Sequence, residues 1–459
     1  MAAQNPIRAL LAAVVLTACA GSNGIAPVTS AAGGPTTTAA ASTTTSSLPE
    51  GMIVPSQCAD ASITTVPPGG TTTTTVVTTE LDEDDQRRLV EAFDEHVREV
   101  YFDPDLGGVA WDLEIAVLLA EVDAGLATQD LYERLDDLLV SLGDEHSRFE
   151  TPEQVAISDE IFAGENDYVG IGILALSVPE DHLVTIISVL PGSPADAAGL
   201  APHDSIVAVD GIPLGDEPGT ESDRLRGPEC TIVQMTVRSP DGSERVVTTA
   251  RARVQGNLPI ELRILPDADG RIAYLLIPTF ADATIDDQVR DALEEVGPHD
   301  VLVIDLRTNG GGSSVVAEPI MALFTSGELG EYSSREGTRT LVIDGAPIHN
   351  SATVPLAILI GEHTESYGEI VAGILSHRPG TVLVGETTDG NVETLHGFGL
   401  PGDAMVWIAA EIFVPAGDPA ADWEREGIVP DIEVATDWED ITLDADPAVD
   451  AAVAALTGA

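Results

Sequence analysis

The chain has 459 residues, which is long enough for two or three domains with hydrophobic cores. Its formal net charge is −57, and it contains no lysine, so all 20 basic residues are arginines. After residue 79 the acidic residues are spread along the whole chain without a basic stripe, which argues against nucleic acid and anionic lipid head groups as partners. We therefore expect a solvated, salt-adapted surface and no nucleic-acid partner.

The N-terminus has the pattern of an export signal. Arg8 precedes an apolar run over residues 9–16 that is too short to span a bilayer, which takes about 20 residues. The string Leu-Thr-Ala-Cys then ends at Cys19 and resembles a bacterial lipobox, in which cleavage leaves a lipid-modified cysteine at the new N-terminus. We expect residues 1–19 to be a lipoprotein signal peptide and the protein to be extracytoplasmic, anchored to the cell membrane through Cys19. The alternative is an ordinary secretory signal with a chance cysteine, and the protein is then secreted.

Residues 20–79 are dominated by Thr, Ser, Ala, Gly and Pro, a composition that cannot build a core and that predicts a disordered linker. Cys58 lies in this segment, and the sequence leaves open whether it pairs with Cys230 in an oxidising compartment. Neither a CxxC string nor a Cys/His spacing typical of zinc is present. We expect no metal and no cofactor.

From residue 80 the hydrophobic pattern predicts successive domains. Helical spacing near residues 89–96, 113–119 and 131–142 predicts a helical N-terminal domain over 80–155. Short β-type runs with turns predict a β domain over 165–254, with strands at 168–176, 183–189, 205–209, 231–237 and 244–250 and a short helix at 194–199. Alternating strands and helices predict an α/β domain over 260–436, with strands at 272–277, 301–306, 356–360 and 382–384 and helices at 285–296, 315–324 and 367–376. Residues 437–459 are expected to form a C-terminal tail or helix.

Two strings close the helical domain and open the β domain. The first, Leu-Gly-Asp-Glu-His-Ser-Arg-Phe, contains His146, although a lone histidine near a helix end is usually a cap or a packed side chain. The second, Tyr-Val-Gly-Ile-Gly, covers residues 168–172. A glycine-bearing loop that leads into an edge strand can capture the C-terminal carboxylate of a peptide, whereas the alternative is a plain β-turn.

Two further strings follow buried strands of the α/β domain. Residues 305–312 read Asp-Leu-Arg-Thr-Asn-Gly-Gly-Gly, and consecutive glycines let backbone amides approach a ligand closely. The alternative is a loose strand-to-helix turn, and a phosphate loop is disfavoured because the Gly-Lys-Ser/Thr ending is absent. At a strand-to-helix junction, Ser366 stands beside free N–H groups and the positive end of a helix dipole, with Glu369 one turn on. Taken alone, Ser366 and Glu369 also make a Ser-x-x-Glu capping box.

In this order the strings resemble the C-terminal processing peptidases, also called tail-specific proteases, over residues 84–455. That family has an Asp-x-His-Ser/Thr string, a PDZ domain, Asp-Leu-Arg-x-Asn-x-Gly-Gly, Ser-x-x-Glu-Ile and a closing Gly-Ile-x-Pro-Asp. The matches here are residues 144–147, then the 168–172 loop with 191–195 and 225–228, then 305–312, 366–370 and 427–431. Five ordered matches outweigh the capping-box interpretation of Ser366.

The resemblance implies an α+β multidomain fold with an N-terminal helical segment, a PDZ-like β domain and an α/β (crotonase-like ββα) peptidase core. It implies that Ser366 is the nucleophile, Glu369 its acidic partner, and Gly311 with the N–H of Tyr367 the oxyanion hole. Substrate binding is implied for the residues of the PDZ loop, which are Val169, Gly170, Ile171 and Gly172. The implied partners are protein or peptide substrates, bound through their C-termini.

One position departs from the family. Its catalytic lysine follows Gly-Glu-x-Thr-x-Gly, matched by residues 385–390, and at that position this chain has Asn391. An amide cannot accept a proton at a useful pKa, and arginine has no lone pair to offer. We expect His146 to be the general base, as the related tricorn-type and retinoid-binding-like branches use a histidine from this region; His396 and His363 are alternatives.

Two functions follow from the sequence. The first is an exported, membrane-anchored serine endopeptidase that binds proteins by their C-termini and cleaves near them with a base other than lysine. The second is a catalytically inactive, PDZ-containing scaffold or adaptor lipoprotein that binds C-terminal tails. Intact Ser366 and Glu369 and the glycine loop favour the peptidase, because an inactive site has no need of them.

Overall fold

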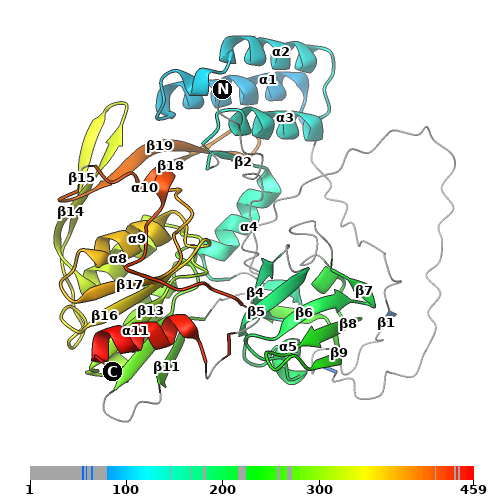
Figure 1. Ribbon diagram of the computed structural model, residues 1–459. Helices are drawn as coiled ribbons and strands as arrows, with labels where there is room; N and C mark the ends of the chain where they lie inside the picture. Colours follow the sequence, from blue (N-terminus) through cyan, green and yellow to red (C-terminus); the bar gives the residue numbers. More distant parts are fainter. Residues whose placement is uncertain are drawn as a thin grey trace, which may run out of the picture. The chain divides into compact units, whose positions relative to one another are not determined.

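The computed structural model describes residues 54–55, 58, 64–65, 80–144, 146–165, 167–178, 182–214, 224–255, 259–265, 271–418, 420–438, 441–442 and 445–458. The chain divides into two compact units, and Figure 1 labels many of their helices and strands. Unit 1 comprises residues 1–73, 166–256 and 438–443, and unit 2 comprises residues 74–165, 257–437 and 444–459. Within the described ranges, none of the helices has both the length and the apolar character needed to cross a membrane. The expected signal peptide, with Cys19, lies outside these ranges.

Three helices with apolar stripes open unit 2. They are α1 (Glu83–Val100), α2 (Trp111–Asp123) and α3 (Thr128–Val140), with a 3-10 turn, η2, at Leu106–Gly108. The Asp82 side chain caps α1, and Leu89, Phe93 and Val97 lie on its buried face. The helical spacing predicted for this segment is confirmed. A further helix, α4 (Pro152–Phe162), follows after a capping box at Thr151.

The core of unit 2 is a six-stranded sheet. Its spatial order is β11 (Glu261–Leu265), β12 (Ile272–Leu276), β13 (Val301–Asp305), β16 (Leu356–Ile360), β17 (Thr381–Gly385) and β20 (Ile432–Glu433), of which only β11 is antiparallel to its neighbour. Helices α8 (Ser314–Phe324) and α9 (Tyr367–Ser376) lie on one face, and α11 (Pro447–Thr457) packs on the other (Figure 1). Helix α7 (Ile285–Val296) packs against α8. Every residue of β12, β13 and β16 is buried, as the continuous apolar runs predict. Because β13 and β16 are parallel neighbours, the loops that follow them emerge together at one edge of the sheet.

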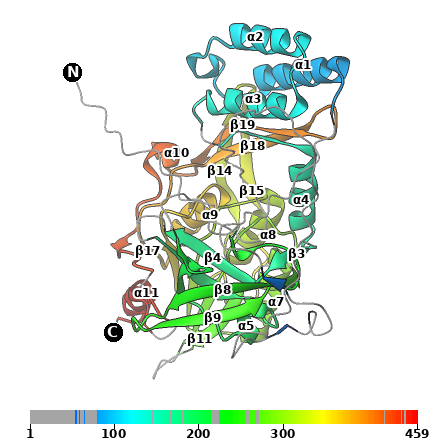
Figure 2. The same ribbon diagram turned by 90° about the vertical axis from the view of Figure 1, so that its right-hand side faces the viewer.

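A second sheet of unit 2 joins the helices to the core. It runs β15 (Gly337–Ile343), β14 (Gly327–Ser334), β19 (Met405–Pro415) and β18 (Glu393–Gly399), and β2 (Arg148–Glu150) also pairs with β19. In Figure 2 the helices α1 to α3 lie over β18 and β19, and they share one apolar cluster with β19. The sequence did not predict this sheet, because strands such as β15 and β18 are largely exposed and lack an apolar run. The short helix α10 (Trp423–Glu426) follows β19.

Unit 1 is a twisted β domain. Its sheet runs β1 (Thr64–Thr65), β8 (Thr231–Arg238), β6 (Ser205–Val209), β5 (Leu183–Val189) and β4 (Ile173–Val178), with β7 (Ile212–Pro213) beside β6 and β9 (Glu244–Ala250) beside β8. A separate pair joins β3 (Asp167–Gly170) to β10 (Ala252–Gln255), and α5 (Pro194–Ala197) is the predicted short helix. The single strand predicted over 168–176 is wrong in its middle, because the chain turns at Gly172, whose φ is +83°. A Cβ on Gly172 would lie 2.3 Å from the Cβ of Ser193, so this turn requires glycine.

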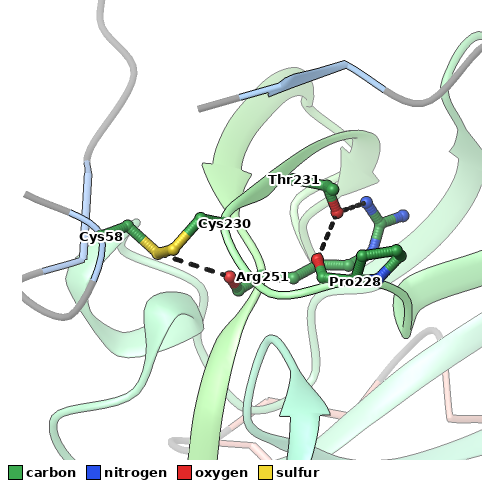
Figure 3. Close-up of a disulfide and its surroundings, with 5 residues drawn as sticks. All are labelled: Cys58, Pro228, Cys230, Thr231 and Arg251. Atoms are coloured by element: carbon green, nitrogen blue, oxygen red, sulfur yellow. Dashed lines mark hydrogen bonds between the residues drawn. A yellow bond between two sulfur atoms is a disulfide. The ribbon is translucent and has the colours of Figure 1, made fainter. Parts of the chain in front are cut away.

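A disulfide joins Cys58 to Cys230, a pairing that the sequence left open (Figure 3). The Cys58 sulfur lies 3.7 Å from the carbonyl oxygen of Arg251, whose guanidinium donates to the Thr231 hydroxyl. Close by in sequence, Thr64–Thr65 pairs with the start of β8. The segment expected to be a linker is therefore attached to unit 1 at these points.

A buried ion triad ties the C-terminal helix to the sheet of unit 2. The Arg307 guanidinium donates to Asp305 and to Asp446 at 2.6 Å each, and all three side chains are almost inaccessible to solvent. Asp446 also caps α11, and the Tyr274 hydroxyl donates to Asp305 at 2.7 Å. Burial alone raises the pKa of Asp305, but Arg307 brings that pKa below its usual value. The triad fixes the start of the glycine loop.

We expect Arg307→Met to lower the free energy of unfolding of unit 2 by about 3–5 kcal/mol, because it leaves two buried carboxyl groups without their cation. Denaturant unfolding followed by tryptophan fluorescence measures the change. Arg425→Met is the control, since Arg425 is exposed and its one ion pair among the described residues is with Asp422, and it should cost less than about 0.5 kcal/mol. A loss below about 1 kcal/mol for Arg307→Met would contradict this role of the triad.

Candidate active site

Ser366 stands between a buried strand and a helix, directly before the first residue of α9. Its φ is +53° and its ψ is −124°, a conformation that costs a residue with a side chain about 1–3 kcal/mol and that clusters at functional sites. Two hydrogen bonds from its N–H hold it there, to the carbonyl oxygen of Asn391 at 2.9 Å and to the carboxylate of Glu369 at 3.2 Å. A simple helix cap does not require this strain, because N-cap residues are ordinarily extended.

The glycine loop lies directly against Ser366. Gly311 has a φ of +82°, and a Cβ on it would lie 2.7 Å from the Ser366 Cβ and 3.0 Å from the Tyr367 nitrogen. Only glycine fits at this position. Tyr367 is the first residue of α9, so its N–H has no acceptor within the helix and lies at the positive end of the helix dipole. The structure thus brings Ser366, Gly311 and Tyr367 together.

The amide of Gly311 is engaged within the loop. Its N–H donates to the side-chain oxygen of Asn309 at 2.9 Å, and its carbonyl oxygen accepts from the N–H of Phe280 at 2.7 Å. The Asn309 side-chain nitrogen in turn donates to Ile277. Gly311 can therefore donate to a substrate oxygen only after its N–H leaves Asn309.

Glu369 acts as a clamp on the loop that contains Asn391. Besides the Ser366 N–H, its buried carboxylate accepts from the Thr388 hydroxyl at 2.5 Å and from the N–H groups of Gly390 and Asn391 at 2.9 Å each. Burial raises the pKa of Glu369 to about 7, and the hydrogen bonds from Thr388, Asn391 and Gly390 oppose that rise. One carboxylate thus joins the backbone of Ser366, the expected nucleophile, to Asn391, the position at which the resemblance implies a lysine.

Asn391 lies beside Ser366. Its N–H donates to Glu369 and its carbonyl oxygen accepts from Ser366, so its backbone is fixed on both sides. Its side-chain oxygen is buried and has no hydrogen-bond partner among the described residues. The position at which the resemblance implies a lysine base therefore lies next to Ser366, but its side chain is an amide.

His146 lies between α3 and β2, with its N–H bonded to Asp144. Its Nδ1 is buried, finds no hydrogen-bond partner in the described ranges, and lies 3.8 Å from Oε2 of Glu393, which is two residues beyond Asn391. Burial, with a smaller effect of Arg148, lowers the pKa of His146 to about 4, so the ring is neutral at neutral pH. In the described part of the chain, no hydrogen bond joins His146 to the Ser366 hydroxyl.

The two alternative histidines are placed differently. His363 is buried in the loop before Ser366, with Nε2 3.6 Å from Glu362, and burial lowers its pKa to about 4. His396 lies on β18, partly exposed, with Nε2 3.5 Å from Oε2 of Glu411, a carboxylate that also binds Arg339. His146, in contrast, has its Nδ1 3.8 Å from Oε2 of Glu393, two positions beyond Asn391.

Sequence reasoning missed two acidic residues of this site. Glu393 begins β18 and is buried, and Glu424 on α10 accepts from the N–H of Val392 at 2.8 Å. The Glu393 and Glu424 carboxyl groups contact each other, and burial and this contact raise the pKa of Glu424 to about 9. No local signal marks either residue, because the chain has 77 acidic residues and these two come from distant segments.

The site is strongly acidic next to the nucleophile. Burial, with the nearby Asp389 and Glu369, raises the pKa of Glu365 to about 8. A cation placed among these carboxyl groups would be stabilised in its charged form. A lysine at position 391 would therefore hold its proton more tightly than in a neutral site.

The residues of the PDZ loop lie at the start of an edge strand of unit 1. Val169 and Gly170 end β3, and Ile171 and Gly172 turn the chain into β4, which among the described strands pairs only with β5. The Arg226 side chain lies over the Tyr168 ring, 5.4 Å from its centroid, and its Nε has no hydrogen-bond partner in the ranges described. A free strand edge, a glycine turn and a guanidinium are what a peptide C-terminus needs for strand addition and carboxylate binding.

These groups suit acyl transfer. A serine hydroxyl at a strained turn, backbone donors of a helix N-terminus and a glycine loop, and a neutral imidazole nearby supply a nucleophile, an oxyanion site and a proton acceptor. The residues predicted from the sequence for the nucleophile, its acidic partner and the oxyanion site meet at one place in unit 2.

Known proteins share this organisation. Residues 271–434 match the model of peptidase family S41, and residues 185–239 match that of the PDZ domain. A carboxyl-terminal-processing protease of Picosynechococcus sp. is 30% identical over 356 residues, which cover 75% of this chain and 82% of that protein. The chloroplastic carboxyl-terminal-processing peptidase 3 of Arabidopsis thaliana is 27% identical over 76% of this chain and 69% of its own length.

A solved structure shows the same fold. The photosystem II D1 C-terminal processing protease matches with a TM-score of 0.54 and 23% identity, over 79% of this chain and 98% of the other. The predicted α+β multidomain fold, with a helical N-terminal segment, a PDZ domain and a peptidase domain, is confirmed. The chain belongs to the carboxyl-terminal-processing proteases, serine-type hydrolases of peptidase family S41.

Proposed function

We propose that this protein is an exported, lipid-anchored serine endopeptidase that binds proteins by their C-termini and cleaves near them, with Ser366 as nucleophile and His146 as general base. The observation that carries the proposal is the strained backbone of Ser366, held against Gly311 and Tyr367 by Glu369 and Asn391. Strain of this kind persists only where surrounding contacts impose it.

Bond cleavage follows the usual order of serine hydrolysis. The Ser366 hydroxyl attacks the scissile carbonyl carbon while its proton passes to the His146 ring, and the oxyanion accepts hydrogen bonds from the N–H groups of Tyr367 and Gly311. For Gly311 this requires release from Asn309. His146 then gives the proton to the leaving amine, and water hydrolyses the acyl-serine in a second cycle.

The base is assigned to His146 because position 391 cannot take a proton and because His146 lies beside the strand that continues from it. The assignment requires the ring to approach Ser366 when substrate binds, and catalytic contacts commonly tighten in that way. A neutral ring at neutral pH suits a base.

Substrate capture is assigned to unit 1. Relatives of this chain are named for carboxyl-terminal processing. The turn at Gly170 and Gly172, the free edge of β4 and the Arg226 guanidinium support capture of a peptide's terminal carboxylate with strand addition. The alternative, a tail-binding scaffold without turnover, uses the same unit.

Membrane anchoring rests on the sequence. The short apolar run and the Leu-Thr-Ala-Cys string ending at Cys19 support export and lipidation, and the Cys58–Cys230 disulfide suits an oxidising compartment outside the cytoplasm.

A fluorophosphonate probe should label the wild-type protein and should not label Ser366→Ala, because only a serine activated by its site reacts. Apolar-tailed peptides should be cleaved by the wild type alone, while their binding survives the substitution. Binding by a folded wild type without labelling or turnover would instead establish the scaffold.

His146→Ala should lower kcat/KM by at least about 10²-fold, because it removes proton transfer in the transition state. Asn391→Ala should stay within about threefold of wild type, since the amide transfers no proton. Steady-state peptide cleavage measures both variants. Loss of activity in Asn391→Ala with retention in His146→Ala rejects the assignment of the base.

The kcat/KM profile should rise through pH about 4 and stay level from about pH 5 to 8, because a base must be neutral and burial lowers the pKa of His146 to about 4. Activity at pH 5 is the most informative point. An acidic limb at or above neutral pH points to a base of higher pKa and counts against His146.

A further inference from the structure

A buried arginine of unit 1, Arg251, spans the loop that leads into β8. It lies between β9 and β10, and its side chain is buried. On one side of the loop its guanidinium donates to the carbonyl oxygens of Arg224 at 2.7 Å and Leu225 at 3.2 Å. On the other side it donates to the Thr231 hydroxyl at 3.1 Å (Figure 3). One side chain thus joins the two ends of the segment 225–231.

The charge of Arg251 is compensated by this loop. Within the described residues, the hydrogen bonds of its guanidinium go to uncharged oxygens and not to a carboxylate. A buried cation is unfavourable unless its donors are satisfied, so the arginine requires the loop in this one conformation. The loop also packs closely on it, because Gly227 has a φ of +148° and a Cβ there would lie 3.1 Å from the Arg251 Nε. The residue before Gly227 is Arg226.

The disulfide between Cys58 and Cys230 acts at the end of the same loop. Cys230 has a φ of +61°, an uncommon conformation for a residue with a side chain, which surrounding contacts must impose. Its N–H donates to the carbonyl oxygen of Arg251 at 2.8 Å, and the Cys58 sulfur lies 3.7 Å from that same oxygen. Both cysteines are buried in one small cluster with Ala252. The disulfide therefore holds the loop end against the backbone of Arg251.

The loop presents Arg226 to the glycine turn of unit 1. The Arg226 Cγ lies 3.9 Å from the position of a Cβ on Gly170, and its guanidinium lies over the Tyr168 ring. Its Nε is buried and has no hydrogen-bond partner in the ranges described. A buried donor without an acceptor is unfavourable, so this group is set to bind an acceptor that a ligand brings, such as a carboxylate.

We propose that Arg251 and the Cys58–Cys230 disulfide form a brace that positions Arg226 for the terminal carboxylate of a substrate. The inference rests on the proposed function, because it presumes that unit 1 captures that carboxylate. With the loop fixed by the brace, Arg226 is oriented before the tail arrives, and binding does not have to order the loop. The brace acts on capture of the tail and leaves the chemistry at Ser366 unchanged.

Peptide binding to the full-length Ser366→Ala protein tests the proposal. Fluorescence anisotropy compares an apolar-tailed peptide that has a free C-terminal carboxylate with the same peptide as a C-terminal amide. The acid should bind at least about tenfold more tightly than the amide. In Arg251→Lys, and separately in Cys58→Ser/Cys230→Ser, this ratio should fall to about threefold or less, while the Kd of the amide stays within about twofold. Lysine keeps the charge but lacks the fork of donors that reaches both sides of the loop.

Arg238→Lys is the matched control, because Arg238 ends β8 far from the loop and pairs with Glu244 at the surface. It should keep the full ratio. In protein with Ser366 intact, the brace variants should raise KM for the acid peptide with little change in kcat, and fluorophosphonate labelling should persist.

Each other outcome overturns the inference in a distinguishable way. A full ratio in both brace variants refutes the brace and leaves carboxylate capture standing. Equal binding of acid and amide by the Ser366→Ala protein refutes carboxylate capture itself, and the brace with it. Equal losses for both peptides in the brace variants would show a general support of unit 1 and would refute the positioning of Arg226.

Discussion

The hydrogen bonds accepted by the Glu369 carboxylate organise this active site. They come from the N–H groups of Ser366, Gly390 and Asn391 and from the Thr388 hydroxyl. With them, one buried carboxylate holds Ser366 in a costly backbone conformation and fixes the loop opposite it. The Gly311 turn completes the arrangement, because any side chain there would collide with Ser366.

The acidic groups of the site would disfavour a lysine as general base. A lysine base must lose its proton, but the neighbouring carboxyl groups of Glu365, Glu369 and Asp389 would favour the protonated ammonium. His146 is neutral at neutral pH, because burial lowers its pKa to about 4. The proposed base therefore lies in the segment between α3 and β2 and not in the loop at position 391.

Much of this site could be predicted from the sequence. The apolar runs of β13 and β16 predict parallel buried strands, and such strands deliver the Gly311 and Ser366 loops to the same edge. The positive φ of Ser366 could not be predicted, because non-local hydrogen bonds impose it. The proximity of Glu393 and Glu424 could not be predicted either. It depends on the largely exposed strand β18 and on the four-residue helix α10, and neither has an apolar period. The pairing of Cys58 with Cys230 likewise depends on where a short segment docks on unit 1.

We propose that His146 is the general base, a role that in this family belongs to a lysine at the position of Asn391. A crystal structure of the protein phosphonylated at Ser366 tests it most directly, because the adduct mimics the tetrahedral intermediate and draws the base into contact. We expect Nε2 of His146 to lie within about 3.2 Å of the Ser366 Oγ, with the phosphonyl oxygen on the Tyr367 and Gly311 amides. A phosphonylated Ser366 with His146 still more than about 5 Å from the Oγ, and another side chain in contact with the Oγ, would show that His146 is not the base.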